Sequence, residues 1–478
     1  MEPFWCGALR VTLLSGRGCV LQCSEELKIQ EVLRQAEDTL QVKLEGLVSS
    51  QKTTLAPHLC LRDVGCRDLT ALAKTTQLVG HSRSLGFALL RADGQVLSWG
   101  LAAAAEPRRL SDVRHVAASE CSYAAVLMDG SLVTWGSSHF GGDSQAVQEQ
   151  VRGVVQIQSS CCAFAALQED GSVISWGHPS MPQTTAERIA GDAWKNPVTA
   201  IQSSSHAFAA LLKDGSVITW GNKDYGGDCS AASLSDVQCL QSSAGAFAAV
   251  CSGGRVVAWG SADYGGLGPE DLHDVTQIQA SARAFAALTR NGHVVAWGDA
   301  SCGGDTGPVA RQLYDVVAIA SAPRAFCALR ADGAAVAWGD PGSGGRGVEG
   351  LREVQAIRAT ARAFAAIQRD GSVITWGHSS CGGDSSSVSH QLWGVRHIQS
   401  STRAFAALRR DGQVVAWGSR DFGGDAAAVM EMLYDVQMIQ SSRNAFAALR
   451  EDGHVICWGG DDEPQIIDQT LQRISLSG

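Results

Sequence analysis

The sequence predicts a mainly β protein in which about ten short antiparallel sheets follow a small amino-terminal α+β segment. Two regularities support this prediction. Ten Trp-Gly pairs recur at intervals of 36 to 44 residues, and an aromatic residue stands twelve positions before each of these tryptophans. Self-similarity at such a period is the signature of a repeat protein. The tryptophans are Trp99, Trp135, Trp176, Trp220, Trp259, Trp297, Trp338, Trp376, Trp417 and Trp458, and their aromatic partners are Phe87, Tyr123, Phe164, Phe208, Phe247, Phe285, Phe326, Phe364, Phe405 and Phe446.

Each repeat is expected to contain a β-hairpin of fixed length. Between its two aromatics stands Asp-Gly in eight copies, and Gly-Gly or Asn-Gly in the other two. These dipeptides favour the left-handed backbone of a tight two-residue turn. In the copy that contains Phe405 and Trp417, a turn at Asp411-Gly412 would place Ala406 opposite the Trp417 ring, so that a large side chain faces a small one. A three-residue bulged loop would shift this pairing by one residue.

A third strand is predicted before each hairpin, in stretches such as "VVQIQSS" (154–160), "DVTQIQAS" (274–281) and "VRHIQSS" (395–401). The variable stretch after each Trp-Gly, often with a Gly-Gly pair, has room for a short fourth strand. Each copy is therefore a small antiparallel sheet of about 40 residues, apolar on both faces and covered by its neighbours. Sheets of this size that repeat radially are the blades of a β-propeller, so the predicted architecture is a β-propeller-like array.

The repeat pattern "ALxxDGxVxxWGxxxxGG", seen at 407–424 and 366–383, resembles the regulator of chromosome condensation repeat family. The superfamily also includes the propeller-shaped bacterial β-lactamase inhibitor protein II. The resemblance covers about residues 76–478 and implies a β-propeller. The family most often has seven blades, so ten shorter copies are a departure, and most copies have Ala-Phe where many family members have a histidine. One ten-bladed ring, an open spiral and two unequal rings are the alternatives.

The segment before the repeats has a different pattern. "LRVTLLSG", "CVLQCS", a helical "LKIQEVLRQAEDTL", "LEGLVSS" and "LTALAK" give the order strand, strand, helix, strand, strand. This order and length resemble the ubiquitin-like β-grasp fold, so we predict a ubiquitin-like domain over 1–75 and the repeat array over 76–478. On such folds the sheet face binds partners, and Leu14, Leu47 and Leu72 are candidates for that patch. The alternative is that these leucines are core residues.

Composition narrows the function classes. The formal net charge of −10 argues against a protein that mainly holds nucleic acid. No apolar run approaches the ~20 residues of a membrane span, and no secretory signal is expected at the amino terminus. The 15 cysteines contain no CxxC motif, which is typical of free thiols in a reducing compartment. We therefore expect a cytoplasmic protein, with the nucleus as the alternative, that binds neither nucleic acid nor membrane.

The sequence contains no recognised catalytic motif: HExxH, GxSxG and GxxxxGK[ST] do not occur. We therefore predict no catalytic residue, no cofactor and no metal; adjacent Cys161 and Cys162 suit neither a standard disulfide nor a zinc site. Gly-Gly-Asp recurs at Asp143, Asp228, Asp305, Asp384 and Asp425. A calcium site needs several clustered carboxylates, so we interpret each Gly-Gly-Asp as a turn in which the aspartate bonds nearby backbone.

A row of arginines is the candidate binding site. Four of them stand two residues before successive aromatics and a fifth is displaced by one: Arg283, Arg324, Arg362, Arg403 and Arg443. Earlier copies have Cys162, His206 and Gly245 at this position. Equivalent positions take equivalent places in a repeat array, so the arginines should form an arc of positive charge on one rim and bind an anionic protein partner. The alternative is that each arginine pairs with a nearby acid, such as that of a Gly-Gly-Asp.

The function predicted from these features is a non-catalytic protein–protein interaction scaffold, and not an enzyme. Large ubiquitin ligases carry similar propellers before a catalytic domain, whereas only about 20 residues follow Trp458 here. With the ubiquitin-like segment, this suggests an adaptor or substrate receptor linked to the ubiquitin pathway. Guanine-nucleotide exchange on a small GTPase, the activity of the founder of the repeat family, is the alternative. Enzyme inhibition, as by the bacterial inhibitor, is a weaker alternative.

Overall fold

The computed structural model describes residues 6–13, 18–24, 27–40, 44–48, 61, 68–73, 77–80, 86–90, 96–100, 110, 113–178, 196–460, 465–467 and 473–475. By its internal contacts the chain divides into two compact units. The first comprises Met1–Gln77 with Leu89–Val96 and Arg109–Val113, and the second comprises the rest. None of the described helices is long and apolar enough to span a membrane.

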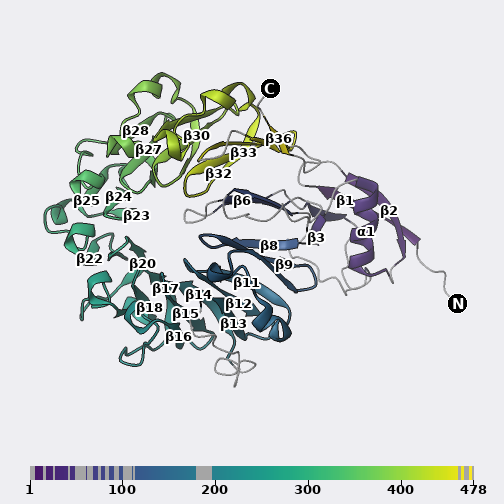
Figure 1. The fold of residues 1–478 in the computed structure, drawn as a ribbon, viewed down its shortest axis with the longest axis horizontal. Coiled ribbons are helices and arrows are strands. Elements are labelled where there is room, and N and C mark those ends of the chain that lie inside the picture. The colour runs from purple at the N-terminus through teal and green to yellow at the C-terminus, as the bar shows by residue number, and fades with distance from the viewer. Residues whose placement is uncertain are drawn as a thin grey trace. The chain divides into compact units, whose positions relative to one another are not determined.

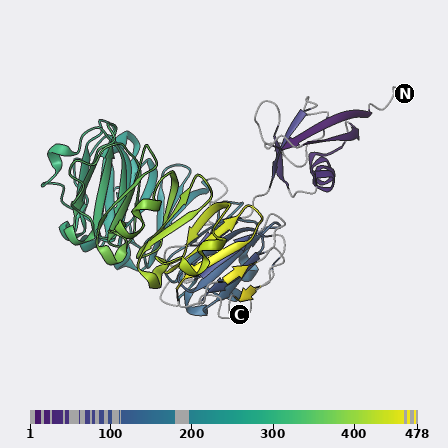
Figure 2. The ribbon, with the colours of Figure 1, turned by 90° about the horizontal axis from the view of Figure 1, so that it is seen from above.

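The first unit contains a four-stranded mixed sheet and one helix (Figure 2). Its elements are β1 Cys6–Leu13, β2 Gly18–Ser24, α1 Ile29–Leu40, β3 Leu44–Val48 and β4 Asp68–Ala73. The sheet order is β2-β1-β4-β3, with β1 and β4 parallel and the other pairs antiparallel. The apolar face of α1 is buried through Ile29, Val32 and Ala36, at the helical spacing that the sequence indicates. The assignment to the ubiquitin-like β-grasp fold, and the domain boundary at residue 75, remain predictions.

Ten further sheets follow along the chain, one for each Trp-Gly repeat, as expected for a mainly β repeat protein (Figure 1). The first strands are β5 Gln77–Gly80, β8 Val113–Ala118, β11 Val154–Ser159, β14 Val198–Ser203, β17 Val237–Ser242, β20 Val275–Ala280, β23 Val316–Ala322, β26 Val354–Ala359, β29 Val395–Ser400 and β32 Val436–Ser441. The middle strands are β6 Gly86–Leu90, β9 Ser122–Leu127, β12 Ala163–Gln168, β15 Ala207–Leu212, β18 Ala246–Cys251, β21 Ala284–Thr289, β24 Ala325–Arg330, β27 Ala363–Gln368, β30 Ala404–Arg409 and β33 Ala445–Arg450. The third strands are β7 Val96–Gly100, β10 Leu132–Gly136, β13 Val173–Gly177, β16 Val217–Gly221, β19 Val256–Gly260, β22 Val294–Gly298, β25 Ala335–Gly339, β28 Val373–Gly377, β31 Val414–Gly418 and β34 Val455–Gly459.

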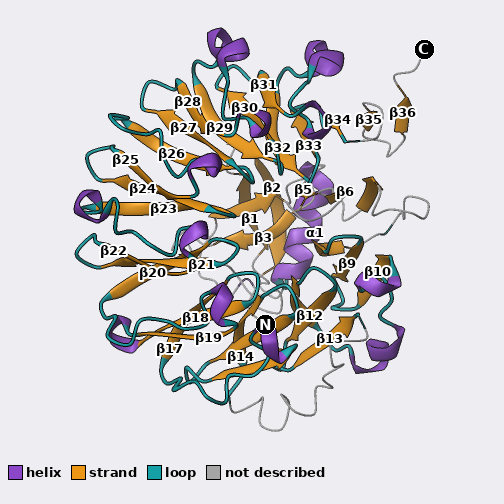
Figure 3. Cartoon of the chain, turned by 60° about the vertical axis from the view of Figure 1, so that its left-hand side comes forward, coloured by secondary structure: helices purple, strands orange, loops and turns teal. Residues whose placement is uncertain are grey.

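In the described residues, nine of these sheets have three strands, and the last gains β35 Gln465–Ile467 and β36 Arg473–Ser475. Of the alternatives of three or four strands per copy, three are found, because the described linkers between the other sheets form short 3-10 helices instead of a fourth strand (Figure 3). One set follows directly on Trp-Gly: Ser138–Phe140, Lys223–Tyr225, Ala262–Tyr264, Ala300–Cys302, Pro341–Ser343, Ser379–Cys381 and Arg420–Phe422. The others in these linkers are Gln145–Gln150, Ala310–Gln312, Ser386–Gln391 and Ala427–Met432, whereas Ser252–Gly254 lies in the hairpin loop between β18 and β19. These repeated antiparallel sheets are consistent with a β-propeller.

The predicted hairpin register is wrong by one residue. Phe405 lies opposite Trp417, and Ala406 lies opposite Ala416 instead of the tryptophan. The two rings stack with their centroids 5.3 Å apart. The same pairing recurs in the nine hairpins from β9–β10 to β33–β34, with centroid distances of 5.3 to 5.5 Å.

The shift arises because the turn is a three-residue bulged loop. The N–H of Arg409 donates to the carbonyl of Gln413 at 2.9 Å, so residues 410–412 form the loop. A type I′ turn needs a positive φ at both central residues. Gly412 has φ +80°, whereas Asp411 does not belong to the residues with positive φ. The glycine therefore supplies the left-handed position of a bulge, while Asp411 accepts the N–H of Gln413 at 3.2 Å.

Close packing is instead achieved between neighbouring sheets. Ala404, Ala406 and Leu408 on one face of β30 share a core with Phe446 and Trp458 of the next sheet. The opposite face of β30 belongs to the core shared with the preceding sheet. All six residues of β30 are buried, as a strand covered on both faces must be. The small residue that faces each large ring thus comes from the adjacent repeat and not from the other strand of the hairpin.

The first glycine of each Gly-Gly pair packs against the aromatic residues of the next repeat. Gly382 has φ +88°, and a Cβ built on it would lie 2.7 Å from the ring of Phe405. Its carbonyl accepts the indole N–H of Trp417 at 3.0 Å. Glycine is required here both by the left-handed backbone and by the close approach of the aromatic ring.

Candidate functional site

Neighbouring repeats meet at the turn between the first and middle strand of each sheet, which we call the first turn. These turns are joined by backbone hydrogen bonds of 2.8 to 3.1 Å: Ser205 N–H donates to Ala244, Ala244 to Ala282, Ala282 to Pro323, Ala361 to Thr402, and Thr402 to Arg443. Equivalent positions of successive copies are therefore neighbours in space, as the repeat predicts.

A buried hydroxyl fixes the geometry of the first turn. Ser401, 3% exposed, donates its Oγ–H to the carbonyl of Phe422 at 2.8 Å and accepts the N–H of Ala404 at 3.1 Å. The corresponding donation is made by Ser119, Ser204, Ser243, Ser281 and Thr360. The residue two positions after this hydroxyl, which immediately precedes the middle strand, is thereby held in a constant place.

The predicted arginine row occupies this place. Arg283, Arg362 and Arg403 are the residues two positions after this hydroxyl in their sheets, and Arg324 takes the same place immediately before β24, although Ala322 stands there instead of the hydroxyl. Arg443 follows in the next first turn. The backbone hydrogen bond from Thr402 to Arg443 continues the row into the last sheet. The structure therefore brings the five predicted residues into one series along the first turns.

Three of the five arginines have carboxylate partners. Arg283 Nη1 lies 3.2 Å from Asp299 Oδ2, and Arg324 Nε lies 3.9 Å from Asp340 Oδ2. A hydrogen bond from Ser301 holds the pKa of Asp299 below its ordinary value, and the charges of Arg283 and Arg324 lower it further. Both acids directly follow a Trp-Gly pair, so the partners are not the Gly-Gly-Asp acids.

The fifth arginine of the row joins distant parts of the repeat array. Arg443 Nη1 lies 2.9 Å from Glu120 Oε1, so a first turn of the last sheet contacts the first turn between β8 and β9. Within the described residues, no single sheet contains strands from both of these repeats.

Arg362 and Arg403 differ from their neighbours because the residue after Trp-Gly is His378 in one copy and Ser419 in the other. No ion pair to either arginine occurs among the described residues. Both arginines are exposed, and Arg403 lies over the ring of Phe422 at 5.0 Å. The uncompensated positive charge of the row is therefore concentrated on two adjacent sheets.

A cavity of about 420 Å³ lies beside the row. It is lined by small residues of five successive first turns, at 242–244, 280–282, 321–323, 359–361 and 400–402. Serine, threonine, alanine and proline make up this lining, so it offers hydroxyl and backbone groups but no charge. Arg283, Arg324, Arg362 and Arg403 are each the next residue after a lining segment, which places four cations at its border.

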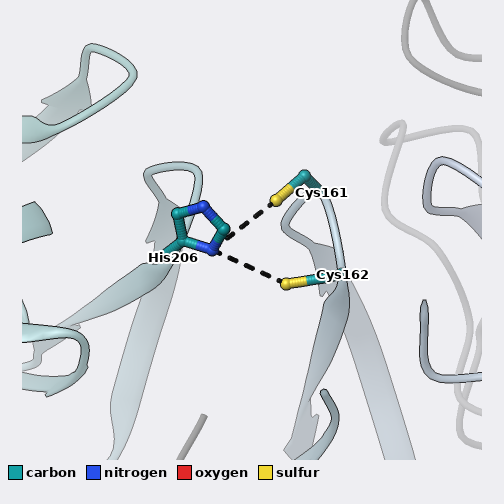
Figure 4. A group of neighbouring side chains, drawn as sticks. All are labelled: Cys161, Cys162 and His206. Carbon is teal, nitrogen blue, oxygen red and sulfur yellow. Dashed lines mark hydrogen bonds between the residues drawn. The ribbon is translucent and has the colours of Figure 1, made fainter. Parts of the chain in front are cut away.

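The same position in two earlier copies forms a thiol–imidazole cluster that sequence reasoning missed (Figure 4). The Sγ atoms of Cys161 and Cys162 lie 3.9 and 3.8 Å from Nδ1 of His206. Cys162 is 7% exposed, and its hydrogen bond with Cys161, together with burial, raises the pKa of its thiol. The signal in the sequence was the repeat itself, because Cys162 and His206 occupy equivalent positions of adjacent copies.

The Gly-Gly-Asp interpretation as a turn is confirmed. In all five copies the aspartate Oδ1 accepts the backbone N–H of the residue two positions later, at 2.7 to 2.9 Å. Among the residues that the structure describes, these carboxylates form no common group with metal-binding spacing. Each aspartate therefore closes a local turn.

The three leucines of the predicted ubiquitin-like patch are placed as follows. Leu47 is fully buried in β3 of the first unit, which agrees with the alternative that it is a core residue. Leu14 lies outside the described residues, and for Leu72 only the backbone of β4 is described. The patch therefore remains a prediction for Leu14 and Leu72 alone.

Comparison with known proteins gives a family match and distant structural similarities. The family model "Regulator of chromosome condensation (RCC1) repeat" matches residues 275–303, which cover the sheet β20–β22 and the linker up to the first glycine of the following Gly-Gly pair. No curated protein matches the chain. The match to one repeat supports the resemblance that the Trp-Gly pattern indicates.

Among solved structures, the chain is similar to Prp20p of Saccharomyces cerevisiae (13% identity, TM-score 0.33, covering 63% of this chain and 79% of that one). It is also similar to human WBSCR16 (14%, 0.34, 72% and 89%). A third similarity is to the ectodomain of the Physcomitrella patens receptor kinase CR4 (14%, 0.35, 56% and 72%). Similarity this distant says nothing about function. The role of this chain is therefore inferred from the repeat match and from the geometry of the first turns.

Proposed function

We propose that the chain is a non-catalytic scaffold that binds an acidic segment of a protein partner at its first turns. The observation that carries the proposal is the pair Arg362 and Arg403, exposed on adjacent sheets with no carboxylate partner among the described residues. A carboxylate that bridges two such arginines makes charge-assisted hydrogen bonds stronger than neutral ones. The uncharged cavity beside them offers hydroxyl and backbone groups to the rest of the segment.

The fold does not depend on an ion pair of Arg362 or Arg403, which supports a binding role for these two charges. The carbonyls of Arg362 and Arg403 accept the N–H of His378 and Ser419 at 2.8 and 3.0 Å, so the backbone makes the hydrogen bond that the fold uses at both positions. Two exposed cations on neighbouring sheets repel each other, and a partner carboxylate relieves that repulsion.

The test is affinity isolation of partners with the full chain carrying R362E and R403E. The matched control is R369E with R410E, which makes the same charge change at exposed positions on the hairpin loops of the same two sheets. We expect the first variant to lose about tenfold or more in affinity for a partner captured by the wild-type chain. The wild-type affinity should also fall with added salt. Equal binding by both variants would refute the arginine site.

The alternatives from the sequence give different outcomes in parallel assays. A guanine-nucleotide exchange factor would accelerate GDP release from a small GTPase, and an inhibitor would slow an enzyme that it captures, whereas a scaffold does neither. Prp20p is described as binding Gsp1p and histones and yeast RCC1 as bound to Kap60; those partners belong to those proteins. They make Gsp1-type GTPases the first to test.

A role as adaptor or substrate receptor in the ubiquitin pathway extends the same proposal. It rests on the order of elements in the first unit. Isolation with the full chain and with a chain that lacks residues 1–75 separates the two halves, because only the full chain should capture ubiquitin-pathway proteins. We place the function in the reducing cytoplasm, with the nucleus as the alternative, a proposal supported by the lack of a disulfide among the ten cysteines whose side chains the structure describes.

A further inference from the structure

Two thiols and one imidazole converge at the first turns of the third and fourth repeats (Figure 4). The donor atoms of Cys161, Cys162 and His206 all lie within 4.8 Å of one another. Zinc bonds of about 2.3 Å to sulfur and 2.0–2.1 Å to nitrogen, at the tetrahedral angle, put sulfur and nitrogen about 3.6 Å apart. The observed separations of 3.9 and 3.8 Å need only a few tenths of an ångström of movement.

The frame holds these three side chains toward one another. Residues 161 and 162 form a bend before β12, so two adjacent cysteines can point to the same side, which alternating strand geometry would forbid. The carbonyl of Cys162 accepts the N–H of His178 at 3.0 Å, and that of His206 accepts the N–H of Asn222 at 2.9 Å. The thiol of Cys161 donates to the carbonyl of Ser205 at 2.7 Å, which ties the two turns together.

We propose that Cys161, Cys162 and His206 bind one thiophilic metal ion, Zn²⁺, with a fourth coordination position left for water or for a ligand from a bound partner. Thiolate and imidazole ligands select zinc over hard cations. On binding, the two Sγ–H bonds break, both protons pass to the solvent, and two Zn–S bonds and one Zn–Nδ1 bond form. The ion therefore gains two thiolates, and two protons are released for each metal bound.

Cys162 and His206 stand at the same repeat position as the arginine row, immediately before the middle strand, and Cys161 is the residue before Cys162. One series of first turns would thus present a metal centre in two sheets and cations in later ones. The inference does not depend on the proposed binding of an acidic segment, because metal binding is measured without any partner.

The test is titration of the reduced, metal-free full chain with Co²⁺ and then Zn²⁺. We expect one Co²⁺ per chain, with the visible bands of a tetrahedral ion and a thiolate charge-transfer band, both abolished by one equivalent of Zn²⁺. Zinc binding should release two protons, seen with a pH indicator in weak buffer. In the variants C162S and H206Q the affinity for Co²⁺ and Zn²⁺ should fall by more than 10–100-fold, which is the loss typical when a residue that only hydrogen-bonds to a metal ligand is replaced. The control C239S with H390Q removes an exposed thiol and an exposed imidazole elsewhere and should bind normally.

A second measurement on the wild-type chain does not depend on how the variants fold. Zinc should protect Cys161 and Cys162, but not the exposed Cys239, from alkylation as read by mass spectrometry. Equal alkylation with and without zinc would overturn the proposal. So would formation of a Cys161–Cys162 disulfide in a chain that binds no Co²⁺ after reduction, because the pair would then serve redox chemistry.

Discussion

Replacing the repeat tryptophans by phenylalanine should cost different amounts in two copies that look alike in sequence. Trp417 is 2% exposed and donates its indole N–H to the carbonyl of Gly382 at 3.0 Å. Trp220 is 4% exposed and stacks on Phe208 at 5.4 Å, but its indole N–H has no hydrogen-bond partner in the part of the chain that the structure describes. The two substitutions remove the same atoms, so their difference isolates the hydrogen bond.

The magnitude follows from the two hydrogen-bond states. Trp417→Phe removes a bond with a net value of about 0.5–1.5 kcal/mol and leaves the Gly382 carbonyl without its donor. Trp220→Phe instead removes a buried polar group that has no partner, whose burial costs about 1–3 kcal/mol, and this relief offsets part of the lost packing. The two effects add in the difference, so we expect Trp417→Phe to be the more destabilising by about 1.5–4.5 kcal/mol. Truncation of Trp417 to alanine should cost about 3–5 kcal/mol, because it also empties the space against Phe405.

A repeat array of this size need not unfold in one step, so a global melting curve is the wrong assay. Native-state amide hydrogen exchange reports local opening free energies, and the amides of β30–β31 and β15–β16 should be compared in the two variants. Equal losses of protection at the two sites would refute the assigned role of the indole hydrogen bond.

Two further predictions concern the frame. Gly382→Ala should destabilise by about 2–5 kcal/mol, combining the left-handed backbone with the clash against Phe405; Gly253→Ala, at φ +74° with nothing within 4 Å of its Cβ, should cost only the backbone term, about 1 kcal/mol. Native-state amide hydrogen exchange in β30–β31 and in β18–β19 checks this, and equal losses of protection in the two variants would contradict the close-approach argument. Burial, followed by the charge of Arg358, holds the pKa of His397 below 6.5. Between that lowered pKa and 6.5 the folded state binds fewer protons than the unfolded state, so stability should rise with pH through this window and be lost on acidification. His397→Gln should flatten the profile of local opening free energy against pH, read from amide hydrogen exchange in β29–β30, and an unchanged profile would assign the effect to other groups.

The repeat, the three strands and the turn role of Gly-Gly-Asp could be predicted because they depend on local chemistry at fixed spacing. The hairpin register could not, because Asp411-Gly412 suits both a two-residue turn and a three-residue bulged loop. The choice between the two was decided by packing across sheets: stacking Phe405 on Trp417 puts both rings on one face, opposite the alanines of the neighbouring sheet. Sequence reasoning applied the large-against-small rule within the hairpin, whereas the fold satisfies it between hairpins.

The candidate sites were predicted unevenly for a related reason. The arginine row is visible because one residue type recurs, but its pairing is not, since it depends on whether aspartate, histidine or serine follows Trp-Gly. The metal cluster mixes residue types 44 residues apart, and only contact between equivalent first turns brings Cys162 and His206 together. A search for metal ligands by local spacing cannot find such a site. A search that aligns the repeats and compares equivalent positions of neighbouring copies can find it.

The position immediately before the middle strand is suited to variation because the fold uses its backbone in every one of these copies. Its carbonyl accepts an N–H from the residue after Trp-Gly at 2.8 to 3.0 Å in eight copies, whether the residue is cysteine, histidine, glycine or arginine: Cys121, Cys162, His206, Gly245, Arg283, Arg324, Arg362 and Arg403. The buried hydroxyl and the aromatic stack on either side fix where the side chain begins. A different side chain there changes the chemistry without removing this backbone hydrogen bond, and neighbouring copies combine their side chains because the first turns are in contact. A propeller-like array can thus hold a metal centre in two sheets and a cationic surface in others, and both candidate sites arise from this one position.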